Sequence, residues 1–127
     1  MTTDATTEDE PRLRVGVVGV GHLGQHHARV LVAMPGVELV GVADARPDQA
    51  RAVAERTGTR AFDDYRALLG KVDAVSIAVP TRLHREVAGA FLERGVATMV
   101  EKPLAASFAE AEELVGLARA CGAVLQV

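Results

Sequence analysis

The chain has 127 residues, 49% of them hydrophobic and 24% charged, which is enough for one domain with a single buried core. Residues 1–10 hold four acids and no base, while the other 13 of the 17 acids nearly balance the 14 lysines and arginines. This balance argues against a nucleic-acid groove or a polybasic membrane surface. No run approaches the roughly 18 apolar residues that span a bilayer. The single cysteine excludes an internal disulfide or a multi-cysteine metal site.

The first twelve residues are acidic and poor in large apolar side chains, so they cannot repay the entropy of ordering. We therefore expect a disordered acidic tail over residues 1–12 and one folded domain over residues 13–127. The tail lacks the basic start and apolar stretch of a signal peptide. With the lone Cys121 expected to be a packed, unreactive thiol, these features favour a cytoplasmic protein.

Six short apolar runs follow, rich in valine and alanine, as in strands that are buried on both faces of a parallel sheet. The predicted strands are residues 13–19, 37–44, 59–62, 73–80, 97–101 and 123–127.

Longer helical segments separate these runs. Residues 22–34 stop at Pro35-Gly36, and the next helix is opened by Pro47 and closed by Gly58. The apolar side of the first helix is predicted to carry Leu23, His27, Val30, Leu31 and Met34. The remaining helices start at capping residues: Asp63 or Asp64 for a short helix to Leu69, Thr81 for a helix to Gly95, and a capping box of Ser107 and Glu110 for a helix that stops at Gly122.

Strands that alternate with helices across short connections predict a doubly wound parallel α/β sheet, the Rossmann fold, with about six strands and helices on both faces. Such sheets bind ligands outside the carboxyl ends of the strands, where the strand order reverses. Functional residues should therefore lie at the strand ends.

The first strand ends in a glycine pattern, GVGHLG, that suits a dinucleotide. Gly19 permits a tight turn, Gly21 removes the Cβ that would block a pyrophosphate, and Gly24 lets the helix pack closely on the sheet. The helix start offers amides and a positive dipole to the anion, so His22 and Leu23 are also candidate cofactor contacts. Since the pattern follows a strand and opens a helix, we expect dinucleotide binding rather than a purely structural turn.

Asp44 ends the second strand, where a carboxylate accepts hydrogen bonds from the adenosine ribose diol and repels a 2′-phosphate. This position predicts NAD as the cofactor. Two alternatives stay open: Arg46 could clamp the 2′-phosphate of NADP, or Asp44 could merely cap the next helix.

Three histidines, His22, His26 and His27, suggest a metal site at first sight. No third ligand is visible and the zinc-protease order is absent, so we expect no metal. We interpret these imidazoles as facing solvent or lying beside the pyrophosphate.

The fourth strand ends in AVPTRLH, where Pro80 terminates the strand. Thr81 and His84 should then lie on the rim beside the cofactor. For Thr81, helix capping is an equal and compatible alternative.

Lys102 directly follows the fifth strand. The basic residues include only two lysines, Lys71 and Lys102. A lysine in this place suggests proton exchange near neutral pH, which an arginine cannot perform. A plain surface lysine is the alternative.

Together, the glycine loop, Asp44, VPTRLH and above all EKPLA resemble the glucose-fructose oxidoreductase, inositol dehydrogenase and MocA (Gfo/Idh/MocA) family over residues 13–127. The resemblance implies an NAD(P)-dependent oxidoreductase that passes hydride between nicotinamide and a secondary alcohol of a sugar, cyclitol or nucleotide sugar. By position, it implies that Lys102 assists proton transfer with a lowered pKa beside the nicotinamide, that Glu101 lies near the nicotinamide ribose, and that the Lys102–Pro103 peptide is cis.

Members of this family continue into a second domain that covers the nicotinamide and supplies the partner of the lysine. We interpret the chain as the cofactor half of such an enzyme, with a naturally short protein as the alternative. Apolar surface left by a missing domain and an open edge at strand six predict self-association. The alternative function is a non-catalytic dinucleotide-binding module or redox sensor.

Overall fold

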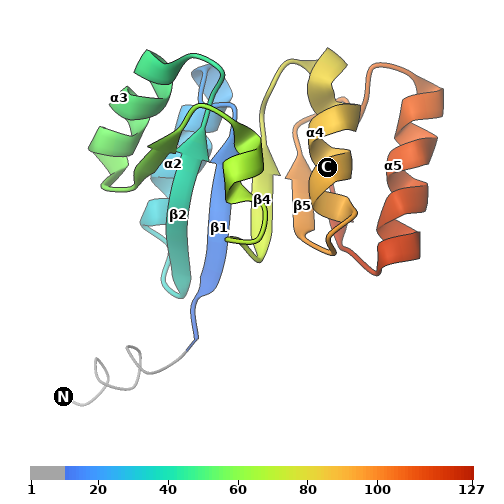
Figure 1. The fold of residues 1–127 in the computed structure, drawn as a ribbon, viewed down its shortest axis with the longest axis horizontal. Helices are drawn as coiled ribbons and strands as arrows, with labels where there is room; N and C mark the ends of the chain where they lie inside the picture. The colour runs from blue at the N-terminus through green and yellow to red at the C-terminus, as the bar shows by residue number, and fades with distance from the viewer. Residues whose placement is uncertain (1–10) are drawn as a thin grey trace.

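The computed structural model describes residues 11–127, so most of the tail expected over residues 1–12 lies outside the described residues. Six parallel strands form one sheet in the order β3-β2-β1-β4-β5-β6 (Figure 1). The strands are β1 (Leu13–Val18), β2 (Val37–Ala43), β3 (Arg60–Phe62), β4 (Ala74–Ile77), β5 (Ala97–Val100) and β6 (Leu125–Gln126). The chain runs outward from β1 to β3, returns to β4 beside β1, and runs outward again to β6, which is the predicted doubly wound Rossmann arrangement.

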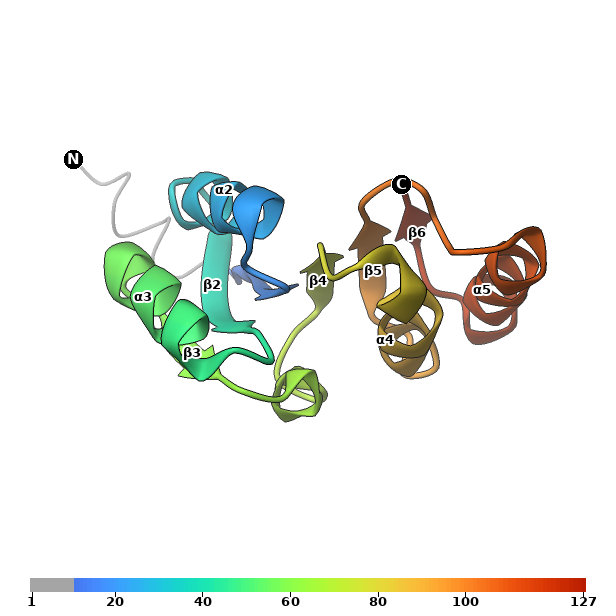
Figure 2. The same ribbon diagram turned by 90° about the horizontal axis from the view of Figure 1, so that it is seen from above.

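Helices cover both faces of this sheet. They are α2 (His22–Val32), α3 (Pro47–Thr57), α4 (His84–Leu92) and α5 (Phe108–Cys121), with the 3₁₀ turns η1 (Tyr65–Leu68) and η2 (Thr81–Leu83). Figure 2 shows α2 and α3 on one face and α4 and α5 on the other. Within residues 11–127, no helix has the length and apolar composition needed to cross a bilayer.

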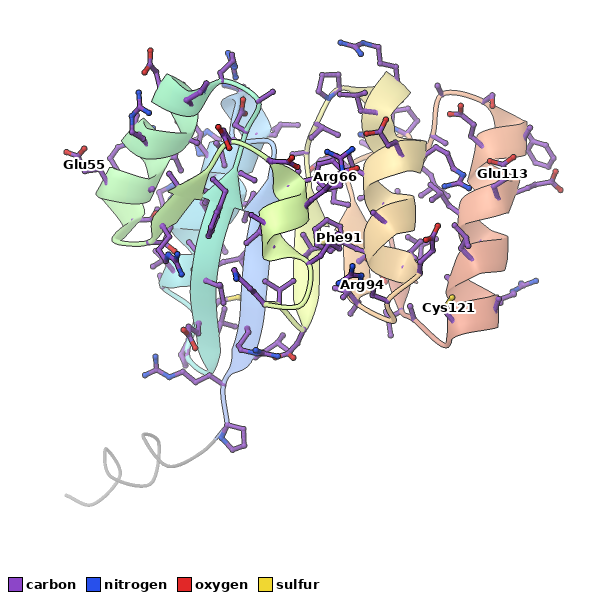
Figure 3. All side chains as sticks on the ribbon, viewed as in Figure 1. Glu55, Arg66, Phe91, Arg94, Glu113 and Cys121 are labelled. Carbon is purple, nitrogen blue, oxygen red and sulfur yellow. The ribbon has the colours of Figure 1, made fainter. Side chains whose placement is uncertain are left out.

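One apolar cluster on each face holds the layers together. On the side of α2 and α3, Val17 of β1 packs with Ala28 and Val53. On the other side, Ile77 of β4 packs with Phe91 of α4, which Figure 3 labels. Because burying apolar area stabilises a fold by roughly 25 cal/mol per Å², these two clusters fix the sheet and leave its carboxyl edge free for a site.

Several helix ends follow the predicted signals. Pro47 is the first residue of α3, and Gly58 ends that helix with a left-handed φ of 71°. The Ser107 hydroxyl accepts a hydrogen bond from the Glu110 amide at 3.2 Å, as in a capping box. The reciprocal bond is missing: Oε1 of Glu110 is buried without a hydrogen-bond partner in the part of the chain that the structure describes.

Helix α2 turns only part of the expected apolar side to the sheet, where Leu31 packs against the cluster beneath the helix. Its buried residues are Gly24 and Ala28, whereas Leu23 and Val30 of the expected apolar stripe are 51% and 50% exposed. Because Gly24 brings the helix axis close to the strands, only small side chains fit beneath it, and the larger ones lie along its flank.

Two segments expected as helix starts are 3₁₀ turns instead. Asp64 caps η1 by accepting from the Arg66 amide at 2.9 Å. Thr81 begins η2 without a side-chain capping bond, so the prediction that Thr81 caps the next helix is wrong. The chain first tightens into this turn, in which the Leu83 amide donates to the Pro80 carbonyl at 2.9 Å, and α4 begins only at His84.

Candidate functional site

A cleft of about 710 Å³ lies at the carboxyl ends of β1, β2 and β4, where the strand order reverses. This is the place where open α/β sheets bind ligands. The residues that line the cleft include Gly19, Gly21, Asp44, Arg46, Tyr65 and Pro80.

The three glycines of the loop after β1 differ in what surrounds them. Gly19 has a φ of 88°, and a Cβ there would lie 2.7 Å from the backbone of Val79. A Cβ on Gly24 would overlap the carbonyl oxygen of Gly19. A Cβ on Gly21 would instead meet only Arg46, at 3.5 Å. Packing therefore requires the first and third glycines, while the second leaves space that belongs to the cleft.

Asp44 holds the loop from the end of β2. Its Oδ2 accepts from the Val20 amide at 3.0 Å, and its Oδ1 accepts from the Arg46 amide at 2.9 Å. Burial raises the pKa of this carboxyl, but the hydrogen bonds from the Arg46 and Val20 amides and the Arg46 guanidinium together hold it below its usual value. Asp44 is thus a carboxylate at neutral pH, directed at the glycine loop. It does not cap α3, whose N-cap is Arg46 without a side-chain bond.

Arg46 lines the cleft beside Asp44. Its Nε donates to Oδ1 of Asp44 at 3.3 Å, while its side chain is 67% exposed and that of Asp44 only 10%. Asp44, which would favour NAD, and Arg46, which would favour NADP, are therefore paired with each other.

His84 lies behind the wall of the cleft rather than on its rim, because it is only 1% exposed. Its Nε2 is 3.0 Å from the carbonyl oxygen of Val79, and its Nδ1 is 3.0 Å from that of Pro103. The turn η2 carries His84 inward, so the ring ties the loop after β4 to the loop after β5. Pro80 does line the cleft, whereas Thr81 does not.

Glu101 and Lys102 follow β5, one strand beyond the cleft. The Glu101 amide donates to the Ile77 carbonyl at 3.0 Å, which sets this segment against the end of β4. The Lys102–Pro103 peptide is cis, as the resemblance implied. Lys102 is exposed, and within residues 11–127 its ammonium forms no ion pair.

The histidines of α2 do not share one environment. The rings of His22 and His26 meet edge to face at 5.7 Å between centroids, near the solvent side. His27 is turned inward: Nδ1 lies 2.8 Å from Oγ of Ser76, and Nε2 lies 2.8 Å from Oε2 of Glu101. The prediction that His27 lies on the apolar side of this helix is therefore confirmed, while its interpretation as facing solvent or the pyrophosphate is wrong. Among the described residues, no group of three His, Cys, Asp or Glu side chains could hold a metal ion.

Sequence reasoning missed a polar group on the far wall of the cleft. Tyr65 donates its hydroxyl to Glu86 at 3.2 Å, and the guanidinium of Arg66, labelled in Figure 3, lies 4.9 Å from the centre of the Tyr65 ring. These residues come from η1 and α4, which meet only in the folded chain. Cys121, also labelled in Figure 3, is exposed at the end of α5 and not packed as we expected.

A doubly wound sheet with a glycine loop at its switch point, facing an acid at the end of the second strand, defines a dinucleotide-binding Rossmann domain. Residues 13–127 match the family model described as "Oxidoreductase family, NAD-binding Rossmann fold". The chain belongs to this family, the Gfo/Idh/MocA oxidoreductases, which bind NAD.

Curated relatives include dehydrogenases of sugars. The chain is 42% identical over 115 residues to UDP-N-acetylglucosamine 3-dehydrogenase of Acidithiobacillus ferrooxidans, covering 91% of this chain and 36% of that protein. It is 39% identical over 117 residues to D-glucoside 3-dehydrogenase of Escherichia coli (strain K12), covering 89% of this chain and 33% of that protein. The chain thus spans about a third of the length of these relatives.

Solved structures agree in fold. The crystal structure of the Acidithiobacillus ferrooxidans enzyme superimposes with a TM-score of 0.86 at 41% identity, over 92% of this chain and 38% of the other. That of GenD2 from gentamicin A biosynthesis, in complex with NAD, superimposes with a TM-score of 0.87 at 35% identity, over 92% of this chain and 34% of the other.

Proposed function

We propose that the chain is the cofactor-binding part of an NAD-dependent dehydrogenase that oxidises or reduces a secondary alcohol of a sugar, cyclitol or nucleotide sugar. The observation that carries the proposal is the cleft in which Gly21 leaves space opposite the carboxylate of Asp44, one strand away from Lys102. The names of the relatives, which act on a nucleotide sugar and a glucoside, support the substrate class.

The residues of the cleft fit the cofactor part by part. The space beside Gly21, which a Cβ would occupy, suits a pyrophosphate next to the uncapped start of α2. Oδ1 of Asp44 already accepts from the amide and from Nε of Arg46, but Oδ2, which accepts only from the Val20 amide, keeps a further acceptor site for a ribose hydroxyl. NAD would supply the hydride acceptor, and the protein binds and orients it.

NAD is the preferred nucleotide in this proposal. Asp44 is ionised and nearly buried, so a 2′-phosphate at the same place would meet like charge. Arg46 supports NADP only weakly, because its guanidinium is engaged by Asp44.

Lys102 takes or returns the proton of the substrate hydroxyl in this proposal, and Glu101 accepts a hydrogen bond from the nicotinamide ribose. Both follow β5, and Lys102 has no competing carboxylate within residues 11–127. We assign the substrate wall and the partner of the lysine to a further domain of a longer protein, since the chain spans 36% of its relative.

Self-association of the isolated chain and a cytoplasmic location also stay predictions, the second supported by the single cysteine.

Calorimetric titration of the chain with NAD and NADP tests the binding step. We expect NAD to bind, and Gly21→Ala to weaken NAD at least about tenfold without changing the unfolding midpoint, because the new Cβ enters only the cleft. Gly116→Ala is the matched control, since a Cβ at that position meets nothing within 4 Å. If NAD does not bind at millimolar concentration, or if Gly21→Ala binds it as well as the natural chain, the site is wrong.

The enzyme and the non-catalytic module differ in their need for Lys102. In the full-length protein, Lys102→Ala is expected to lower kcat for hydride transfer by at least about 100-fold while NAD affinity changes little. An unchanged kcat would favour the module or redox sensor.

A further inference from the structure

Three polar side chains, joined by hydrogen bonds, lie across the contact between α2 and the second half of the sheet. The ring of His27 lies between Oγ of Ser76 on β4, at 2.8 Å, and Oε2 of Glu101 at the end of β5, also at 2.8 Å. Three elements that are distant in sequence therefore meet through two hydrogen bonds.

The hydrogen-bonded side chains of His27, Ser76 and Glu101 lie where apolar side chains would otherwise pack. Ser76 is 3% exposed within an otherwise apolar strand, and the side chain of His27 is 19% exposed. Helix α2 is already held against the sheet by Gly24 and Ala28. Because burying polar groups costs free energy unless every group is bonded, packing alone gives no reason for the three polar residues.

The carboxylate sets the direction of the hydrogen bonds. Glu101 can only accept, so Nε2 of His27 must carry the proton that it donates to Oε2. The Ser76 hydroxyl then donates to Nδ1 of the neutral ring, or accepts from Nδ1 if the ring is charged. In either state, Oε2 of Glu101 is fixed and the geometry is kept. Within the described residues, Oε1 of Glu101 forms no hydrogen bond, so it is free to accept one from outside.

The position of Glu101 gives that free oxygen a use. Asp44 and Gly21 both line the cleft, and in the proposed function they bind the adenosine ribose and the pyrophosphate. A dinucleotide that continues in the same direction reaches the ends of β4 and β5, where the Glu101 amide is bonded to Ile77. We propose that His27, supported by Ser76, is a positioning residue that holds Glu101 so that its second oxygen accepts a hydroxyl of the nicotinamide-side ribose. This inference rests on the proposed function, in which Glu101 serves that ribose.

Two ligands separate this role from a structural one. NAD carries the nicotinamide-side ribose, whereas ADP keeps the adenosine and the pyrophosphate but lacks that ribose. By calorimetry, we expect His27→Ala to weaken NAD about tenfold, as expected for a lost charge-assisted hydrogen bond. The affinity for ADP should change less than about twofold, because ADP has no second ribose to donate a hydrogen bond to Glu101.

Matched variants sharpen the comparison. His26, the neighbouring histidine, is exposed and meets Arg29 and the His22 ring, so His26→Ala should leave the affinities for NAD and ADP unchanged. Ser76→Ala should weaken NAD in the same direction but less, because only the support of the ring is lost. His27→Gln should restore part of the affinity, since its amide can accept from Ser76 and donate to Glu101.

A readout without any nucleotide tests the geometry itself. In ¹⁵N spectra of the histidine rings, the His27 signals are expected to show a protonated Nε2. Glu101→Gln should alter these signals, and the corresponding signals of His26 should not move.

The outcomes distinguish the two proposals. If His27→Ala weakens NAD and ADP equally, or weakens neither, His27 is structural and the inference is overturned while the proposed function stands. A ring whose Nε2 is unprotonated would also overturn the inference. If neither NAD nor ADP binds to the natural chain, the proposed function itself fails.

Discussion

At the scale of single residues, the charge at Asp44 should decide between the two nucleotides. Asp44→Asn keeps the shape of the side chain but removes the negative charge that opposes a 2′-phosphate; its one oxygen can accept from the Val20 or the Arg46 amide, not from both. We expect NAD affinity to fall about tenfold and NADP affinity to rise, because Arg46 loses its partner. Titration with both nucleotides measures the ratio of the NAD and NADP affinities. Asp48→Asn, on an exposed part of α3, is the control. An unchanged ratio would show that Asp44 does not select the cofactor.

The same carboxyl should link stability to pH. Its pKa in the folded chain lies below its usual value of 3.8, so its contribution to stability is complete above that value and is lost as the pH falls through the folded-state pKa. We expect the unfolding free energy of Asp44→Asn to depend less on pH than that of the natural chain from about pH 5 to about pH 2. Urea unfolding at a series of pH values checks this, and parallel curves for the two proteins would contradict it.

His84 illustrates how a residue can matter for the site without touching a ligand. His84 lies four residues after Pro80, in the segment that follows β4, as the sequence predicts. The ring nevertheless joins the carbonyl oxygens of Val79 and Pro103, and so it links the cleft to the segment that carries Lys102.

At the scale of elements, the fit of α2 against β1 depends on a single missing methyl group. Gly24→Ala would force a Cβ into the carbonyl oxygen of Gly19 and push the helix start away from the strand. We expect a loss of about 2 kcal/mol or more in unfolding free energy. Gly116→Ala in α5 is the matched control and should be neutral or stabilising by up to about 1 kcal/mol, because its Cβ meets open space. Chemical unfolding of both variants provides the test, and equal effects would contradict the packing described.

At the scale of the whole molecule, one face of the second half of the sheet carries exposed apolar side chains. Met99 of β5 is 41% exposed and Val124, before β6, is 64% exposed. Because side chains alternate along a strand and Val100 and Leu125 face α4 and α5, these two lie on the opposite face. Figure 2 shows no helix over that side of β5 and β6 in the described chain.

We expect this face to drive self-association of the isolated chain. Sedimentation velocity should show a mass that rises with concentration, and the double change Met99→Lys and Val124→Lys should reduce the rise. Phe108→Lys at the start of α5, 78% exposed elsewhere on the surface, should not. A monomer at every concentration would contradict the expectation.

The sequence alone was sufficient for the order of the elements, the doubly wound sheet, the cleft that contains Gly21 and Asp44, and the cis Lys102–Pro103 peptide. These depend on local signals: apolar runs of strand length, Pro47 and Gly58 at helix ends, glycines at fixed spacing, and the EKPLA motif through its resemblance to a known family.

Only the tertiary structure decided which way the side chains of α2 and the segment after β4 point. The rotation of α2 is set by how closely Gly24 approaches the sheet, so Leu23 is half exposed while His27 is turned inward to Ser76 and Glu101. Periodicity placed His27 on the apolar side, but it could not reveal that Leu23 is exposed or which groups the ring of His27 meets, because those partners lie 49 and 74 positions away in the chain. The turn that buries His84 depends in the same way on packing against a distant loop, which no local pattern records.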